Sequence, residues 1–120
     1  MLVADDNRDA ADALAVLLRA WGYEPAVAYD GPSALALARA GPPAAALLGS
    51  ALPGLDGCEV ARRLREMAGT ERAFIVALNG LGGEDAVRRC YEAGIDLLFL
   101  KPYDAVELWR ALDSAVPARA

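Results

Sequence analysis

The chain has 120 residues, of which 56% are hydrophobic, and a net charge of −5 at pH 7. This length predicts a single domain over residues 1–120. The acidic balance argues against nucleic-acid binding, and no apolar run is long enough to span a membrane. The acids that follow residues 1–4 argue against a signal peptide, so we expect a cytoplasmic protein.

Short apolar runs alternate with amphipathic segments, which is typical of βα units and a parallel sheet. In chain order, the first half predicts a strand at 1–4, a helix capped by Asn7 or Asp9 and ended by Gly22, a strand at 24–28, a helix at 33–40 and a strand at 44–48. The first helix has a buried stripe at helical spacing, formed by Leu14, Leu17, Leu18 and Trp21.

The second half of the chain continues the alternation. It predicts a loop at 52–57, a helix that buries Val60, Leu64 and Met67, a strand at 74–78, a helix at 84–93, a strand at 97–100 and a helix from about Asp104. Asp56 is expected as a turn residue or as the cap of the helix after it. The last helix is expected to bury Ala105, Leu108, Trp109, Leu112 and Val116. Five βα units predict a three-layer, doubly wound α/β domain.

Distinctive residues lie at the expected carboxyl ends of the strands, where such folds bind ligands. Asp5-Asp6 follow the first strand, and Asn79-Gly80 follow the fourth. The only lysine of the chain, Lys101, follows the fifth strand and precedes Pro102. Together with the loop at 52–57, this series resembles the receiver domain of two-component response regulators, the CheY-like family. The resemblance covers essentially the whole chain and implies strand order 2-1-3-4-5 with five helices.

The resemblance implies a set of site residues. In the family, a carboxylate that ends the third strand accepts a phosphoryl group from a kinase phosphohistidine, and two acids after the first strand hold Mg²⁺. A hydroxyl after the fourth strand and a lysine after the fifth bind the phosphoryl group, and an aromatic residue three positions before the lysine changes orientation. These positions fall on Gly49 (acceptor), Asp5 and Asp6 (metal), Asn79 (hydroxyl), Lys101 (lysine) and Leu98 (aromatic switch).

Gly49, Asn79 and Leu98 all depart from the family's phosphorylation mechanism. They predict a pseudo-receiver, which is a signalling module and not an enzyme. We expect it to bind a sensor histidine kinase, a phosphotransfer protein or an output protein through the face of the fourth helix, fifth strand and fifth helix, near Leu81, Leu98 and Tyr103. A homodimer through the fifth helix stays open.

No cofactor is expected to be required, and the magnesium site at Asp5 and Asp6 is expected to be weak or lost because one carboxylate is missing. An unpaired buried ion is costly, so Lys101 is expected to pair with Asp5 or Asp6. The resemblance also implies a cis peptide bond between Lys101 and Pro102. Phe99 is expected to face the side of its strand opposite to Leu98.

Three alternatives stay open. The domain could be phosphorylated on a substitute acceptor such as Ser50, next to Gly49. Asp5-Asp6 could be plain helix N-terminal acids, favoured by the helix dipole. An acid pair with a later lysine is also similar to haloacid-dehalogenase-like phosphatases, but those need an Asp-x-Asp pattern and a cap domain. With no histidine in the chain, Cys58 and Cys90 do not predict a metal site, and both are expected to be ordinary helix residues with free thiols.

Overall fold

The computed structural model describes residues 1–49, 52–79 and 84–117. Its strands are β1 (Leu2–Ala4), β2 (Ala26–Ala28), β3 (Ala45–Gly49), β4 (Phe74–Asn79) and β5 (Leu97–Leu100). Its helices are α1 (Arg8–Ala20), α2 (Gly31–Ala40), α3 (Gly57–Glu66), α4 (Glu84–Glu92) and α5 (Ala105–Ala115). Each expected strand and helix is present, with ends that shift by a few residues.

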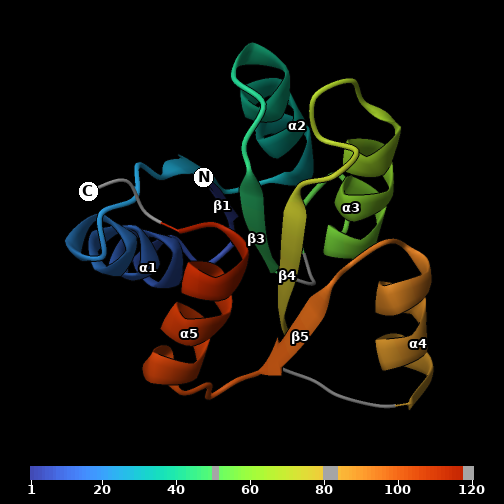
Figure 1. Ribbon diagram of the computed structural model, residues 1–120. Helices are drawn as coiled ribbons and strands as arrows, with labels where there is room; N and C mark the ends of the chain where they lie inside the picture. Colours follow the sequence, from blue (N-terminus) through green and yellow to red (C-terminus); the bar gives the residue numbers. More distant parts are fainter. Residues whose placement is uncertain (50–51, 80–83, 118–120) are drawn as a thin grey trace.

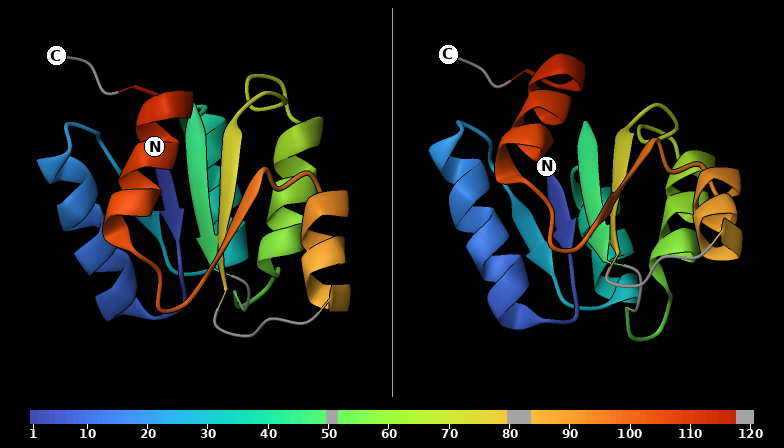
Figure 2. Two further views of the ribbon diagram at one scale, coloured as in Figure 1. Left: turned by 60° about the horizontal axis from the view of Figure 1, so that its bottom comes forward. Right: turned by 90° about the horizontal axis from the view of Figure 1, so that it is seen from below.

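The five strands form one parallel sheet in the order β2-β1-β3-β4-β5. Helices α1 and α5 cover one face of this sheet, and α2, α3 and α4 cover the other (Figures 1 and 2). This arrangement confirms the predicted fold class and strand order. Within the described ranges, no helix is long and apolar enough to cross a membrane.

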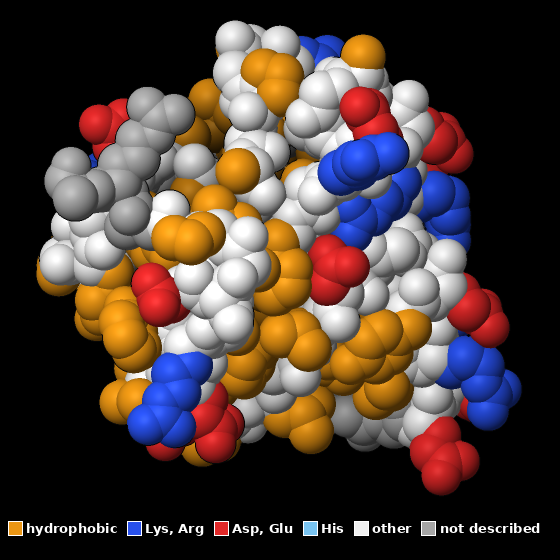
Figure 3. Space-filling model, in the orientation of Figure 1, with side chains coloured by type: hydrophobic (Ala, Val, Ile, Leu, Met, Phe, Trp, Pro, Cys, Tyr) orange, Lys and Arg blue, Asp and Glu red, His pale blue; other side chains and the backbone are white. Residues whose placement is uncertain are grey.

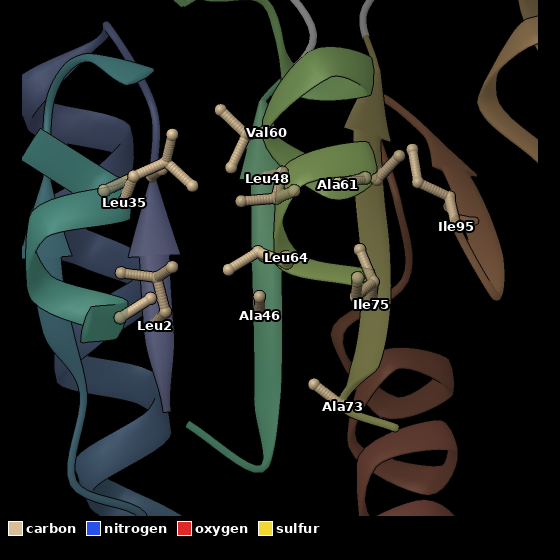
Figure 4. Packing of buried hydrophobic residues seen from close by; sticks show 14 of the residues in the cluster. Leu2, Leu35, Ala46, Leu48, Val60, Ala61, Leu64, Ala73, Ile75 and Ile95 are labelled. Atoms are coloured by element: carbon tan, nitrogen blue, oxygen red, sulfur yellow. The ribbon is translucent and has the colours of Figure 1, made fainter. Parts of the chain in front are cut away.

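The core consists of two hydrophobic clusters, one on each face of the sheet. Because successive residues of a strand point to opposite faces, Ala46 and Leu48 of β3 join the cluster beneath α2 and α3, while Leu47 joins the cluster beneath α1 and α5. Figure 4 shows the first cluster, where side chains of α2 and α3 meet those of β1, β3 and β4. Burial on both faces explains why the central strands are apolar throughout.

Side-chain caps set the starts of the helices. Asn7 Oδ1 accepts a hydrogen bond from the Ala10 N–H at 3.0 Å, and Asp56 and Asp104 cap α3 and α5 in the same way. Asp56 is therefore the cap of the third helix. Helix α2 begins two residues earlier than expected because Asp30 caps it and Pro32 fits its first turn.

A close backbone approach places the loop that follows β3. A Cβ atom on Gly31 would lie 2.5 Å from the Cβ of Leu55, so any larger residue would clash there. The N–H of Gly31 also donates a hydrogen bond to the Pro53 carbonyl at 3.0 Å. The start of α2 therefore supports this loop near the carboxyl edge of the sheet.

The buried stripe of α5 is narrower than the sequence predicts. Leu108 and Leu112 are fully buried, whereas Trp109 is 39% exposed and Ala105 is also exposed. Consecutive helix residues differ by about 100° around the axis, and the line from Leu108 to Leu112 is the one that packs on the sheet. The expected burial of Trp109 and Ala105 was therefore wrong, and Val116 is half-buried.

Candidate functional site

Asp5, Gly49 and Lys101 come from the ends of three strands, β1, β3 and β5, and lie at the carboxyl edge of the sheet. Asp5 directly follows β1, Gly49 ends β3, and Lys101 directly follows β5. Asp5 is buried, and its N–H donates to the Ala28 carbonyl of β2 at 3.1 Å. Parallel pairing of β1 with both β2 and β3 thus holds the Asp5 backbone beside Gly49.

The central contact of the site is an ion pair. The Lys101 Nζ lies 3.1 Å from Asp5 Oδ2, and the other Asp5 oxygen accepts a hydrogen bond from the Asn7 N–H at 3.0 Å. The Asp5 side chain is 10% exposed and that of Lys101 is 37% exposed, so the pair lies at the rim of the fold. Of the two partners expected for Lys101, the structure pairs it with Asp5, while Asp6 is exposed.

Gly49 faces this ion pair without contributing a side chain. A Cβ atom at position 49 would lie 3.4 Å from Asp5 Cγ and 3.4 Å from the Ala4 carbonyl oxygen, which is ordinary van der Waals contact. Gly49 does not have a positive φ, so its backbone conformation does not require glycine. The position therefore accommodates a Cβ atom, which would lie next to the Asp5 carboxylate.

The residues before Lys101 divide between the two faces of β5. Leu98 is half-buried and packs against the cluster beneath α2, α3 and α4, whereas Phe99 packs against the opposite cluster. The expected opposite orientation of Phe99 is confirmed. Phe99 also meets Tyr103 edge to face, with ring centroids 6.3 Å apart. The peptide bond between Lys101 and Pro102 is cis.

Three residues named in the sequence analysis cannot be placed in this site. Asn79 is the last residue of β4, and its side chain lies outside the described part of the chain. Ser50 and Leu81 also lie outside the described residues.

A groove runs from the ion pair along α1 toward the start of α5. Its volume is about 480 Å³, and its lining residues are Asp5, Asn7, Ala10, Ala13, Leu14, Leu17, Leu78, Lys101, Pro102 and Tyr103. Burial, and next the charge of Asp5, raises the pKa of the half-buried Tyr103. Sequence reasoning missed this groove because its walls come from segments that are far apart in the chain.

The site offers few ligands to a metal ion. Across residues 1–49, 52–79 and 84–117, no three His, Cys, Asp or Glu side chains gather as a metal site would require. Asp5 and Asp6 are the two carboxylates after β1, and one oxygen of Asp5 already binds the Lys101 ammonium. Mg²⁺ prefers a near-octahedral set of oxygen ligands, and an ion bound here would compete with Lys101 for Asp5.

A second surface of interest exposes hydrophobic side chains along the edge strand and the helix beside it. We call it the β5–α5 face and define it by four exposed residues, Leu97, Leu100, Val106 and Trp109. Leu97 and Leu100 point to opposite sides of β5. Figure 3 shows hydrophobic side chains over the region of α5 and β5. Leu98 and Tyr103, which the sequence analysis expected near this surface, are half-buried.

The match to a family model identifies the class of this protein. Residues 1–113 match the response regulator receiver domain, so the chain belongs to the receiver domains of two-component response regulators. The expected family is therefore confirmed.

Two curated relatives and one solved structure illustrate the similarity. The response regulator PleD of Caulobacter vibrioides is 34% identical over 114 residues, which are 95% of this chain and 25% of PleD. The DNA-binding response regulator MtrA of Mycobacterium tuberculosis is 36% identical over 108 residues, 90% of this chain and 46% of MtrA. This chain thus spans a quarter to about half the length of these relatives.

The solved structure is the receiver domain of the sensor histidine kinase PA1611 from Pseudomonas aeruginosa, with a magnesium ion coordinated in its active site cleft. It is 28% identical, with a TM-score of 0.88, and the match covers 98% of this chain and 96% of that one.

Proposed function

We propose that this receiver domain is a protein-interaction module of a two-component pathway, and that its state does not depend on phosphorylation of an aspartate at the end of β3. The observation that carries the proposal is Gly49. It occupies the end of the central strand, facing Asp5, where the resemblance to other receivers puts the acceptor carboxylate. Glycine has no side-chain oxygen, so no phosphoryl group can be carried there.

The charges around Gly49 support this proposal. With a carboxylate at position 49, the site would hold three acids and one ammonium group. Here the two acids are Asp5 and Asp6, and Lys101 is already bound to Asp5. The ammonium therefore has a partner without any phosphoryl group. This ion pair stabilises one arrangement of the site, which suits a module that does not switch by phosphorylation.

We propose that the magnesium site is weak or lost. The related PA1611 receiver domain coordinates magnesium in its active site cleft, but this chain has two acids after β1 and glycine at the end of β3. When bound, a magnesium ion would supply positive charge next to a phosphoryl group. Asp5 and Asp6 would be its carboxylate ligands, and the ion would have to compete with Lys101 for Asp5.

The partners we propose are a sensor histidine kinase, a phosphotransfer protein or an output protein, which would bind the β5–α5 face. Exposed Leu100, Val106 and Trp109 provide the apolar and aromatic contacts that typically anchor protein interfaces. Trp109 is the strongest candidate anchor because aromatic side chains are enriched among residues that dominate binding. A second copy of the chain could also cover these apolar side chains. Sedimentation velocity at increasing protein concentration would reveal such a dimer.

The test is phosphorylation with acetyl phosphate and Mg²⁺, followed by intact mass measurement. We expect no phosphoryl adduct on the natural chain and a labile adduct on Gly49→Asp, because a Cβ atom at position 49 fits without a clash and lies next to Asp5. Gly49→Asn is the matched control, since it has the same size without a nucleophilic carboxylate, and it should stay unmodified.

An adduct on the natural chain would overturn the proposal and indicate a substitute acceptor. Peptide mapping would then locate it, with Ser50 as the first position to inspect. Failure of both Gly49→Asp and the natural chain to react, with both folded by circular dichroism, would show that more than the acceptor has been lost from the site.

A further inference from the structure

The two cysteines of the chain meet at the contact between α3 and α4. Their Sγ atoms lie 3.3 Å apart, although Cys58 and Cys90 are 32 positions apart in the sequence. Both are free thiols, and one hydrogen bond joins them. Cys58 is half-buried in the first turn of α3, while Cys90 is 3% exposed. The expectation of ordinary helix cysteines did not foresee this contact.

Cys90 is also the residue through which helix α4 enters the core. Cys90 is the single buried residue across the whole of α4, which the structure describes from Glu84 to Glu92. It belongs to the cluster beneath α2 and α3, and Cys58 packs against the same cluster. A covalent change at Cys90 would therefore alter the buried side chain of α4.

We propose that Cys58 and Cys90 form an oxidisable dithiol site, in which a hydroperoxide converts the two thiols into a disulfide that ties α3 to α4. The sulfurs would need to approach by little more than 1 Å, since a disulfide bond is about 2.0 Å long. The two cysteines lie on one face of the sheet, and Leu14, Leu17 and Leu78, which line the groove at the ion pair, lie on the other. The dithiol site is therefore separate from that groove.

The exposure of the two thiols sets the order of the steps. Burial, and next the hydrogen bond with Cys58, raises the pKa of Cys90 from 9.0 to about 11, which keeps it protonated at neutral pH. The more accessible Cys58 reacts first, because the thiolate is the reactive form and access controls its encounter with the oxidant. Its thiolate attacks one oxygen of the hydroperoxide, the O–O bond breaks, and Cys58 becomes a sulfenic acid as water or an alcohol leaves.

Cys90 then completes the reaction. Its sulfur attacks the sulfur of the Cys58 sulfenic acid, the S–O bond breaks, and the Cys90 proton leaves with the hydroxide as water. In total, two thiols lose two electrons and two protons to the hydroperoxide. Another dithiol can reduce the disulfide back to two thiols, as expected of the transient disulfides that sense redox state in reducing compartments.

The test oxidises the reduced chain with hydrogen peroxide and then alkylates the denatured protein with N-ethylmaleimide. We expect the intact mass to fall by two hydrogens with no alkyl groups added, and dithiothreitol to restore two alkylation sites. Peptide mapping should link the segments around Cys58 and Cys90. The extent of reaction should not depend on protein concentration, because the bond forms within one molecule.

Cys58→Ala and Cys90→Ala serve as the matched variants. Neither can form the bond, and Cys90→Ala should stop at a sulfenic or more oxidised Cys58. The proposal would be overturned if the natural chain gave the same products as Cys90→Ala, with Cys90 still open to alkylation. It would equally be overturned if the disulfide linked two molecules on a non-reducing gel.

A second measurement tests the effect on α4. The disulfide closes a segment of about 30 residues, so the oxidised chain should melt on the order of 10 °C higher than the reduced chain. Amide exchange in α4 should become slower upon oxidation, with little change in α1 on the other face of the sheet. If the amide exchange rates in α4 did not change upon oxidation, the disulfide would not restrain this helix.

Discussion

Arg65 illustrates how one residue can join distant segments of a chain. Its guanidinium donates to the Gly94 carbonyl at 2.7 Å, to the Ala73 carbonyl at 2.6 Å and to the Asp96 carboxylate at 2.8 Å. Asp96 in turn accepts the N–H of Ile75. Arg65 therefore links the end of α3 with the starts of β4 and β5, using the planar set of donors that lysine lacks.

The sequence did not reveal this role. Arg62, Arg63 and Arg65 lie together on one helix and all have the pattern of a solvated surface. Arg62 and Arg63 do pair with Glu59 on the surface. Arg65 differs because α3 ends near the amino ends of two strands whose carbonyls need donors, and only the tertiary arrangement shows that.

At the start of α2, Asp30 predicts a pH dependence. The N–H and hydroxyl of Ser33 stabilise the ionised carboxylate and lower the pKa of Asp30 below its ordinary value of 3.8. A carboxyl with a lowered pKa contributes stability that is complete above 3.8 and is lost as pH falls through its folded-state pKa. Asp30→Asn keeps a capping oxygen without a titrating charge.

We therefore expect the natural chain to have a higher melting temperature than Asp30→Asn near neutral pH. The difference between the two melting temperatures should narrow as pH falls below about 4. Melting curves followed by circular dichroism from pH 7 to pH 3 would measure it. Asp9→Asn is a matched control for the loss of one surface charge in the first turn of a helix. A gap that stayed constant with pH would contradict the assigned ionisation.

At the scale of the elements, α5 shows which residues attach a helix to the sheet. Leu108 and Leu112 are fully buried, while Trp109 is 39% exposed. We expect Leu108→Ala to lower the free energy of unfolding by about 2–5 kcal/mol, because it leaves a cavity in the core. Trp109→Ala should cost about 1 kcal/mol, since much of its surface already contacts solvent.

Urea unfolding of both variants would measure these differences. A loss for Trp109→Ala equal to that for Leu108→Ala would mean that the tryptophan packs as the sequence pattern first indicated. The proposed role of Trp109 at the β5–α5 face would then lose its support.

The elements themselves were largely predictable from the sequence. Apolar runs located the five strands, and short polar side chains such as Asn7 and Asp104 located helix starts, because capping is a local interaction. The exposure of Trp109 was not predictable. Helical spacing indicates which residues share a face, but the width of the face that is covered depends on neighbouring elements.

Part of the candidate site was also predictable from the sequence. The carboxyl ends of parallel strands meet at one edge, so Asp5 and Lys101 could be brought together from their order alone. Their pairing at 3.1 Å follows that expectation. The contact between Cys58 and Cys90 joins two helices through side chains, and no periodic pattern in the sequence encodes it.

At the scale of the whole molecule, the proposed loss or weakening of the magnesium site predicts little coupling between magnesium and stability. A ligand that binds only the folded chain stabilises it by RT ln(1 + L/Kd), where L is the free ligand concentration, so a ligand below its Kd adds little. With two acids and a competing ammonium, low-millimolar Mg²⁺ should raise the melting temperature of the natural chain by less than about 2 °C.

Gly49→Asp should respond more strongly to Mg²⁺, because it adds a carboxylate beside Asp5. Differential scanning fluorimetry with and without EDTA would compare the two proteins, and Ca²⁺ at equal concentration would separate specific coordination from general screening of charge. A large shift for the natural chain would show that Asp5 and Asp6 bind magnesium without a third acid.

The ordinary clearance around Gly49 also has a consequence for the history of this gene. Glycine and aspartate codons can differ by a single nucleotide, and an added Cβ at position 49 would meet Asp5 and Ala4 at van der Waals distance without a clash. The Cβ atom itself therefore needs no compensating change elsewhere. A change from glycine to a carboxylate can therefore be a single mutational step, so persistence of glycine among close descendants of this gene would point to selection against that step.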